Sequence, residues 1–103
     1  TEQSYAPLQQ WRGERLLRQE HRGDTQLHVP DGEVVNTMQE VIAIEVERTL
    51  KPRRRAQEII ENLSRHYQRV WYFVTPMTRA VIAESVADYQ TQFRLYDLPQ
   101  STE

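Results

Sequence analysis

Two glutamates end an apolar stretch at residues 41–47, which reads Val-Ile-Ala-Ile-Glu-Val-Glu. Side chains of a β-strand alternate between its two faces, so this spacing places Glu45 and Glu47 on the same face. Two like charges this close are costly to bury unless a cation, a proton or a basic side chain compensates them. Carboxylate oxygens also hold hard divalent metals. The pair is therefore typical of a metal site, or of a strand end that emerges into water, where glutamates are common.

A third acid stands in a predicted turn. Asp31 lies between a proline and a glycine, in the sequence Pro30-Asp31-Gly32, which is a strong signal for a chain reversal. An aspartate before a glycine commonly hydrogen-bonds the backbone of its own turn. Asp31 is therefore either a turn residue or a further carboxylate of the site that contains Glu45 and Glu47.

Four basic residues follow the two glutamates, namely Lys51, Arg53, Arg54 and Arg55. They surround the first turn of a helix expected to begin at Pro52, where the macrodipole disfavours each cation by about a few tenths of a kcal/mol. Helix amino ends and arginine side chains both bind phosphate. The run therefore predicts a phosphate-binding surface. The alternative is that these side chains neutralise Glu45, Glu47 and other acids.

In the first half of the chain, the pattern predicts a helix and then three strands. The helix is expected from residue 7 to about residue 22, and the strands at 25–29, 34–35 and 41–47, joined by short turns as an antiparallel meander. If the first strand is regular, His28 lies on the opposite face from Asp31. His28 is therefore interpreted as a packed or surface histidine.

In the second half, helices and strands alternate. A helix begins near residue 52, and its apolar stripe has the spacing of one helical face: Ala56, Ile59, Ile60, Leu63 and Tyr67. A continuous apolar run at 69–75 predicts an interior strand covered on both faces. A helix capped by Thr75 follows, and then a short strand at 93–96. The full order is helix, three strands, helix, strand, helix, strand.

Composition indicates a single soluble domain. The chain has 103 residues, of which 38% are hydrophobic and 27% are charged, with a net charge of −2. There is thus no global positive field, and any contact with nucleic acid must come from a local patch. The absence of cysteine excludes disulfides and thiolate zinc sites. No apolar run approaches the roughly 18 residues of a membrane span, and the N-terminus lacks a signal-peptide pattern, so a cytoplasmic protein without membrane contact is expected.

The order of elements and the acids together resemble the PD-(D/E)xK nuclease superfold, whose core is a helix, a three-strand meander, a helix and a further strand. The signature lies in Pro30-Asp31 and Glu45-Val46-Glu47. More closely, the chain resembles the replication-relaxation family of plasmid and mobile-element proteins. That resemblance covers most of residues 11–98 and is carried by Trp11-Arg12-Gly13-Glu14, His28-Val29-Pro30-Asp31-Gly32, Ile44-Glu45-Val46-Glu47-Arg48-Thr49 and Val70-Trp71-Tyr72-Phe73.

The resemblance implies an α/β fold with the core order αβββαβ, extended by a helix and a short strand. It implies a Mg²⁺ or Mn²⁺ ion held by Asp31 and Glu45, with Glu47 and Glu14 as further members. The sequence departs from the superfold at Glu47, where a lysine usually helps to orient water and to stabilise the developing charge. An acid cannot supply that positive charge. Some restriction enzymes of the superfold carry glutamate at this place, and Lys51 is the basic residue available as a substitute.

The function expected from these residues is metal-assisted hydrolysis of a DNA phosphodiester. Asp31, Glu45, Glu47 and Lys51 are its catalytic candidates, and Lys51 with Arg53, Arg54 and Arg55 is the DNA-binding candidate. One alternative is a degenerate nuclease fold that binds DNA, or a replication or relaxation protein, without cutting. Another is a homodimerisation domain that uses Trp11 or Trp71. Family members carry a winged-helix DNA-binding domain upstream, so residues 1–103, with an ordered core at 7–98, are expected to be the C-terminal module of a longer protein.

Overall fold

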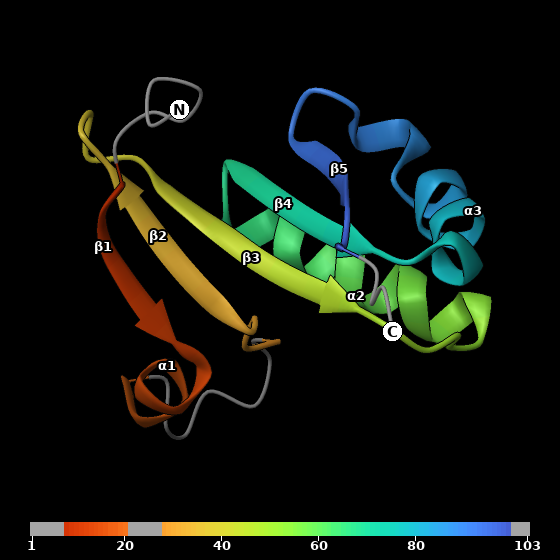
Figure 1. The fold of residues 1–103 in the computed structure, drawn as a ribbon, viewed down its shortest axis with the longest axis horizontal. Helices are drawn as coiled ribbons and strands as arrows, with labels where there is room; N and C mark the ends of the chain where they lie inside the picture. The colour runs from red at the N-terminus through yellow and green to blue at the C-terminus, as the bar shows by residue number, and fades with distance from the viewer. Residues whose placement is uncertain (1–7, 21–27, 100–103) are drawn as a thin grey trace.

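The computed structural model describes residues 8–20 and 28–99, which form a mixed five-stranded sheet with three helices (Figure 1). Strands follow chain order across the sheet: β1 (Leu8–Gly13), β2 (Gly32–Asn36), β3 (Val41–Glu47), β4 (Arg69–Val74) and β5 (Phe93–Asp97). The first three are antiparallel, and β4 and β5 continue the sheet in parallel with β3. The helices are α1 (Glu14–Glu20), α2 (Arg53–His66) and α3 (Pro76–Ser85), followed by a 3₁₀ turn, η2 (Ala87–Tyr89). The α/β class expected from the sequence is confirmed.

The N-terminal region differs from the prediction of a single helix at 7–22. Its first part is β1, antiparallel to β2, and α1 begins only at Glu14. Gly13 weakens a helix at this point, and Trp11 favours a strand, in which it pairs with Val34. The strand expected at 25–29 lies largely outside the described residues, and its last two positions, which are described, are not in a strand.

The reversal predicted between the second and third strands is confirmed. The Asn36 side chain organises it, because its Oδ1 accepts hydrogen bonds from the backbone N–H groups of Met38 and Glu40, at 2.9 and 3.0 Å. The register that results pairs Gly32 with Ile44. Asp31, one residue before β2, is therefore brought alongside the end of β3.

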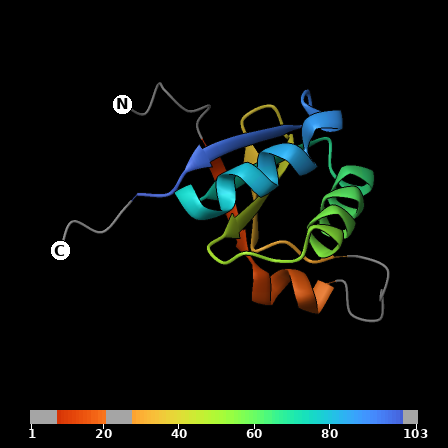
Figure 2. The ribbon, with the colours of Figure 1, turned by 90° about the vertical axis from the view of Figure 1, so that its right-hand side faces the viewer.

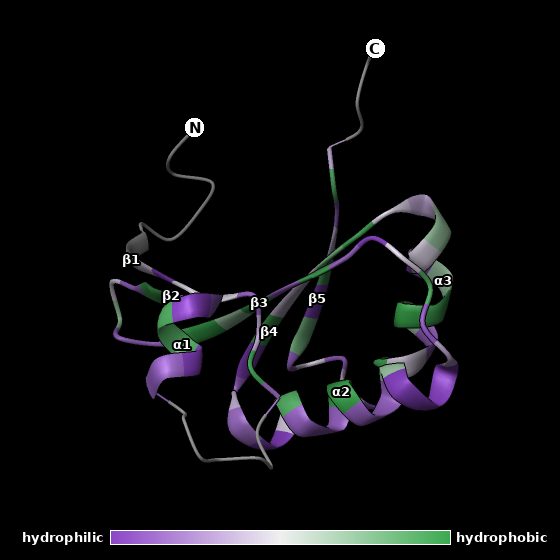
Figure 3. Cartoon of the chain, turned by 90° about the horizontal axis from the view of Figure 1, so that it is seen from below, coloured by the Kyte–Doolittle hydropathy of each residue, from purple (hydrophilic) through white to green (hydrophobic). Residues whose placement is uncertain are grey.

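The main core lies between one face of the sheet and the helices α2 and α3 (Figure 2). The predicted stripe of α2 is buried at Ala56, Ile59, Ile60 and Leu63, and its hydrophilic side faces away from the sheet (Figure 3). Along β4, burial alternates: Val70, Tyr72 and Val74 are buried, and the residues between them are only partly buried. The prediction that β4 is covered on both faces is therefore wrong, because both core helices lie on one side. Among the described residues, no helix is long and apolar enough to cross a membrane.

The start of α3 is fixed to the end of β3. Thr75 caps the helix as predicted, in a capping box with Thr78. The buried Thr78 hydroxyl also donates a hydrogen bond to the backbone carbonyl of Glu47, at 2.9 Å. This contact joins the start of α3 to β3, at the strand end where the two glutamates lie.

Replacing Thr78 with Val should destabilise the fold by about 1–3 kcal/mol, because the buried Glu47 carbonyl would lose its side-chain donor and the capping box would be lost. Denaturant unfolding measures this difference. The matched control is Thr37→Val in the exposed turn after β2, which should change stability by less than about 0.5 kcal/mol. Equal stability of both variants would show that this contact does not secure α3.

Candidate functional site

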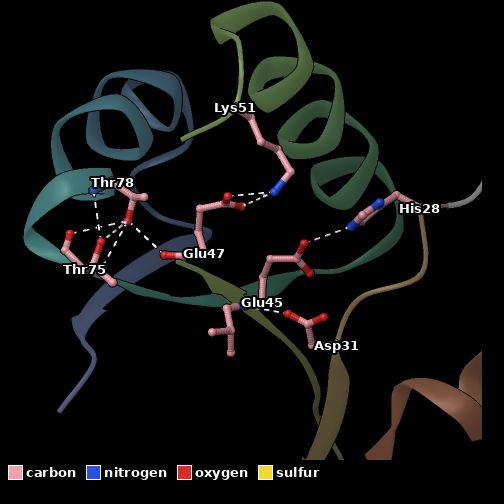
Figure 4. Close-up of polar contacts among 8 residues, drawn as sticks. His28, Asp31, Glu45, Glu47, Lys51, Thr75 and Thr78 are labelled. Atoms are coloured by element: carbon pink, nitrogen blue, oxygen red, sulfur yellow. Dashed lines mark hydrogen bonds and ion pairs between the residues drawn. The ribbon is translucent and has the colours of Figure 1, made fainter. Parts of the chain in front are cut away.

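The two glutamates lie at the carboxyl end of β3 (Figure 4), where the strand extends past its pairing with β2 and is still paired with β4. As predicted, they share a face, and the structure buries both: Glu45 is 6% exposed and Glu47 is 4% exposed. The alternative of a strand end that emerges into water is therefore wrong. The carboxyl ends of parallel strands are common ligand sites in open α/β sheets, so this is the place in the fold where a polar cluster is expected to have a function.

Asp31 reaches this strand end from the segment that precedes β2. Its Oδ2 accepts a hydrogen bond from the backbone N–H of Val46, at 2.7 Å. The bond fixes Asp31 to the residue between the two glutamates rather than to its own turn. The structure therefore brings Asp31 and Glu45 together.

Glu45 is incompletely compensated. Its Oε2 lies 3.0 Å from Nε2 of His28, whereas its Oε1 is buried and has no hydrogen-bond partner in the part of the chain that the structure describes. Figure 4 shows that this second oxygen is turned toward Asp31. Burial raises the pKa of Glu45 above its ordinary value, the His28 contact lowers it, the Asp31 charge raises it, and the nearby backbone N–H of Asp31 lowers it to a smaller extent. A buried carboxylate oxygen without a partner, beside a second acid, favours a proton or a cation at this point.

Glu47 is compensated by the basic residue that the sequence offered as a substitute. Lys51 Nζ donates to both carboxylate oxygens of Glu47, at 2.8 and 2.7 Å. For Lys51, the alternative that it neutralises one of the glutamates is therefore confirmed. Glu47 faces Lys51 rather than the other two acids, and no group of three or more histidine, aspartate or glutamate side chains within residues 8–20 and 28–99 is arranged to hold a metal ion.

Glu14, the outermost predicted member, opens α1 and is half-exposed. Its carboxylate pairs with Arg18 one turn later, at 2.7 Å. The structure therefore gives Glu14 a partner on its own helix and does not place it in the contacts that join Asp31, Glu45 and His28.

The basic run lies at the start of α2, whose first turn contains no acid. Arg53 contacts Glu84, and Arg54 and Arg55 approach Glu58 at 3.6 and 3.5 Å. These side chains are 66%, 90% and 55% exposed, so their ion pairs are weak and can be exchanged for other anions. Of the four predicted cations, Lys51 neutralises a site acid and the three arginines stay available at the surface.

Two neighbours of the acids were not predicted as site residues. His28 was interpreted as packed or on the surface, because a regular strand was assumed through Pro30. Proline breaks such a strand, and this was the available signal. Tyr72 is adjacent to Glu45 in the parallel register of β3 and β4. Burial, together with the charges of Glu45, Glu47 and Asp31, raises the pKa of Tyr72, so its phenol remains neutral at physiological pH.

Comparisons with known proteins do not assign a role to these residues. No family model matches the chain, and neither the curated proteins nor the solved structures contain a match to it. The chemistry of the site must therefore be inferred from the side chains themselves.

Replacing Glu45 with Gln should stabilise the metal-free protein at neutral and alkaline pH. Because the pKa of Glu45 is raised, the folded protein binds this proton more tightly than the unfolded chain does. The stability that Glu45 contributes is present below its ordinary pKa of 4.5 and is lost as the pH rises through the higher folded value. The variant should therefore match wild type at about pH 4 and melt higher at about pH 8.

Thermal melting across this pH range measures the effect, with the exposed α2 residue Glu61 changed to Gln as the control. The control should track wild type at every pH. A Glu45→Gln variant that is less stable than wild type at alkaline pH would show that the ionised carboxylate is fully compensated.

Proposed function

We propose that this chain is a DNA-processing domain of the PD-(D/E)xK type, which acts in a replication or relaxation protein of a plasmid or mobile element. The observation that carries the proposal is the pair of the partly buried Asp31 and the buried Glu45, in which one Glu45 oxygen has no hydrogen-bond partner among the described residues, next to a Glu47 that holds Lys51. The sheet supports it as well. An antiparallel β1–β3 meander, the helix α2 and the parallel strand β4 follow the order of the superfold core, although here α1 follows β1.

Asp31 and Glu45 fit a hard divalent cation. Both supply carboxylate oxygens, which Mg²⁺ and Mn²⁺ prefer, and the unpartnered Glu45 oxygen is turned toward Asp31. When bound, such an ion polarises a phosphate and lowers the pKa of a water molecule. The proposed role of Asp31 and Glu45 is to hold the ion at the end of β3, with Asp31 itself held by the Val46 backbone.

Lys51 supplies the positive charge that the superfold usually takes from a lysine on the strand. Its ammonium group is held by both oxygens of the buried Glu47, so its position is fixed although the side chain is partly exposed. In this arrangement Glu47 positions Lys51 and does not itself need to bind the ion. A preorganised cation near the reacting phosphate stabilises charge that develops in the transition state.

The three arginines at the start of α2 are proposed to bind the DNA backbone. They follow the Lys51 position by a few residues, and the amino end of α2 adds backbone N–H groups that favour phosphate. The whole chain has a net charge of −2 and does not attract DNA by its overall charge. The three arginines would therefore supply the local positive charge that draws the DNA backbone toward the carboxylate pair.

A second candidate function is a binding module that retains the fold without cleavage. Two observations favour it. The described residues lack a set of three metal ligands, and the charge of Lys51 is neutralised by Glu47. In that case the arginines at the start of α2 bind DNA, and the buried acids contribute only to the structure of the strand end.

Cleavage assays on plasmid and single-stranded DNA separate the two functions. If the domain cuts, cleavage should require Mn²⁺ or Mg²⁺, should disappear in Asp31→Ala, and should fall by about a hundredfold or more in Lys51→Gln, while DNA affinity changes little. Asp88→Ala, at an exposed acid of η2, is the control and should cut like wild type. Cleavage that continues undiminished in Asp31→Ala comes from another site, whereas metal-independent binding without cleavage supports the binding module.

Replacing Arg53, Arg54 and Arg55 together with Gln should weaken DNA binding and reduce the salt dependence of log Kobs by up to about one unit for each lost phosphate contact. The fold should be retained, because all three side chains are exposed. A filter-binding titration at several salt concentrations measures both quantities. The control replaces the exposed Arg65 and Arg94 with Gln, and an equal loss in both variants would show that binding does not depend on the start of α2.

A further inference from the structure

The segment from His28 to Asp31 is attached to the fold at both of its ends. At one end, the backbone N–H of His28 donates to Asn62 Oδ1 on α2, at 2.7 Å. At the other end, Asp31 accepts from the backbone N–H of Val46 on β3, at 2.7 Å. Pro30 between them is fully buried. The segment therefore has a fixed path across the strand end, and the positions of its side chains are defined.

The His28 side chain points to the same carboxylate that Asp31 faces (Figure 4). Its Nε2 lies 3.0 Å from Glu45 Oε2, and the other oxygen of Glu45 is the buried, unpartnered atom turned toward Asp31. The two oxygens of Glu45 thus have different surroundings. One is occupied by the imidazole, and the other is available for a cation.

We infer that His28 is a positioning residue for the cation site, an inference that rests on the proposed function. The imidazole fixes the rotation of the Glu45 carboxylate, so that Oε1 faces Asp31. With Glu45 ionised, as cation binding requires, the Nε2–H group is the donor of this contact. Hydrogen bonds to ligating carboxylates typically change metal affinity by about 10–100-fold when they are removed.

Direct nitrogen coordination by His28 is the competing arrangement. The geometry favours positioning, because the imidazole lies at the oxygen of Glu45 that is not turned toward Asp31. The two roles differ in what can replace the side chain. A glutamine amide can donate a hydrogen bond to a carboxylate, but its nitrogen does not ligate a metal as imidazole does.

The test titrates Mn²⁺ alone into the full chain at constant pH and measures affinity by calorimetry. His28→Leu and His28→Ala remove the donor, and His28→Gln retains one. His66→Leu, at the exposed histidine that ends α2, is the matched control. Thermal melting without metal shows which variants fold. Because both His28→Leu and His28→Ala lack the donor, either one alone is sufficient for the test if the other does not fold.

We expect His28→Leu and His28→Ala to bind Mn²⁺ about 10–100-fold more weakly than wild type, with His28→Gln restored to within a few-fold and His66→Leu unchanged. Wild-type affinity in the folded Leu and Ala variants overturns the inference and leaves the proposed function standing, provided Glu45→Gln abolishes binding. A His28→Gln variant as weak as His28→Leu also overturns it, in favour of direct coordination. A wild-type protein that binds no Mn²⁺ removes both the inference and the proposed cation site.

Discussion

The burial of two carboxylates at the end of β3 is the constraint on which the surrounding structure depends. A buried ionised carboxylate is costly unless donors or cations compensate it, and Glu45 and Glu47 are both almost completely enclosed. Each is compensated from a different element. Lys51, in the link to α2, neutralises Glu47 through both oxygens, whereas His28, in the segment before β2, satisfies only one oxygen of Glu45. The two acids therefore differ chemically: Glu47 is neutralised by a cation, whereas Glu45 keeps one oxygen without a hydrogen-bond partner among the described residues.

The sheet register determines which groups reach this point. The antiparallel pairing of Gly32 with Ile44 brings Asp31 beside Val46, and the parallel pairing of Glu45 with Tyr72 places a neutral phenol next to the acids. Thr78 then closes the strand end through the carbonyl of Glu47. Residues separated by up to about half of the chain are therefore held together by backbone pairing and hydrogen bonds. Such a preorganised arrangement is what binding of an ion or a phosphate requires, because little has to be reorganised on binding.

The structure could be predicted from the sequence where the apolar residues follow the regular spacing of a strand or a helix. The alternation in β3 predicted the shared face of Glu45 and Glu47, and the stripe of α2 predicted its buried side. The sequence could not predict the structure where pairing with a distant strand decides the conformation of a segment. Leu8–Gly13 became a strand because β2 offers it hydrogen-bond partners, which no local pattern reports. The expected direction of His28, away from Asp31, was wrong for a related reason: the backbone before Pro30 is not a strand, so the alternation of a strand does not apply to it. Asp31 was recognised as a candidate, but its partner on β3 depends on the register of two strands.

In the proposed function, the charge balance of the strand end would link cation binding to DNA binding. Glu47 and Lys51 neutralise each other, whereas Glu45 has one oxygen without a partner among the described residues and lies beside Asp31. A phosphate that approaches Asp31 and Glu45 would be repelled until a divalent cation or a proton offsets their charge. The arginines at the start of α2 would attract the same phosphate, but their side chains are exposed, so salt would weaken the attraction. In the proposed function, the arginines would favour association of the DNA backbone with this end of the sheet. A cation or a proton at Asp31 and Glu45 would then have to be present before a phosphate could come close to these two acids.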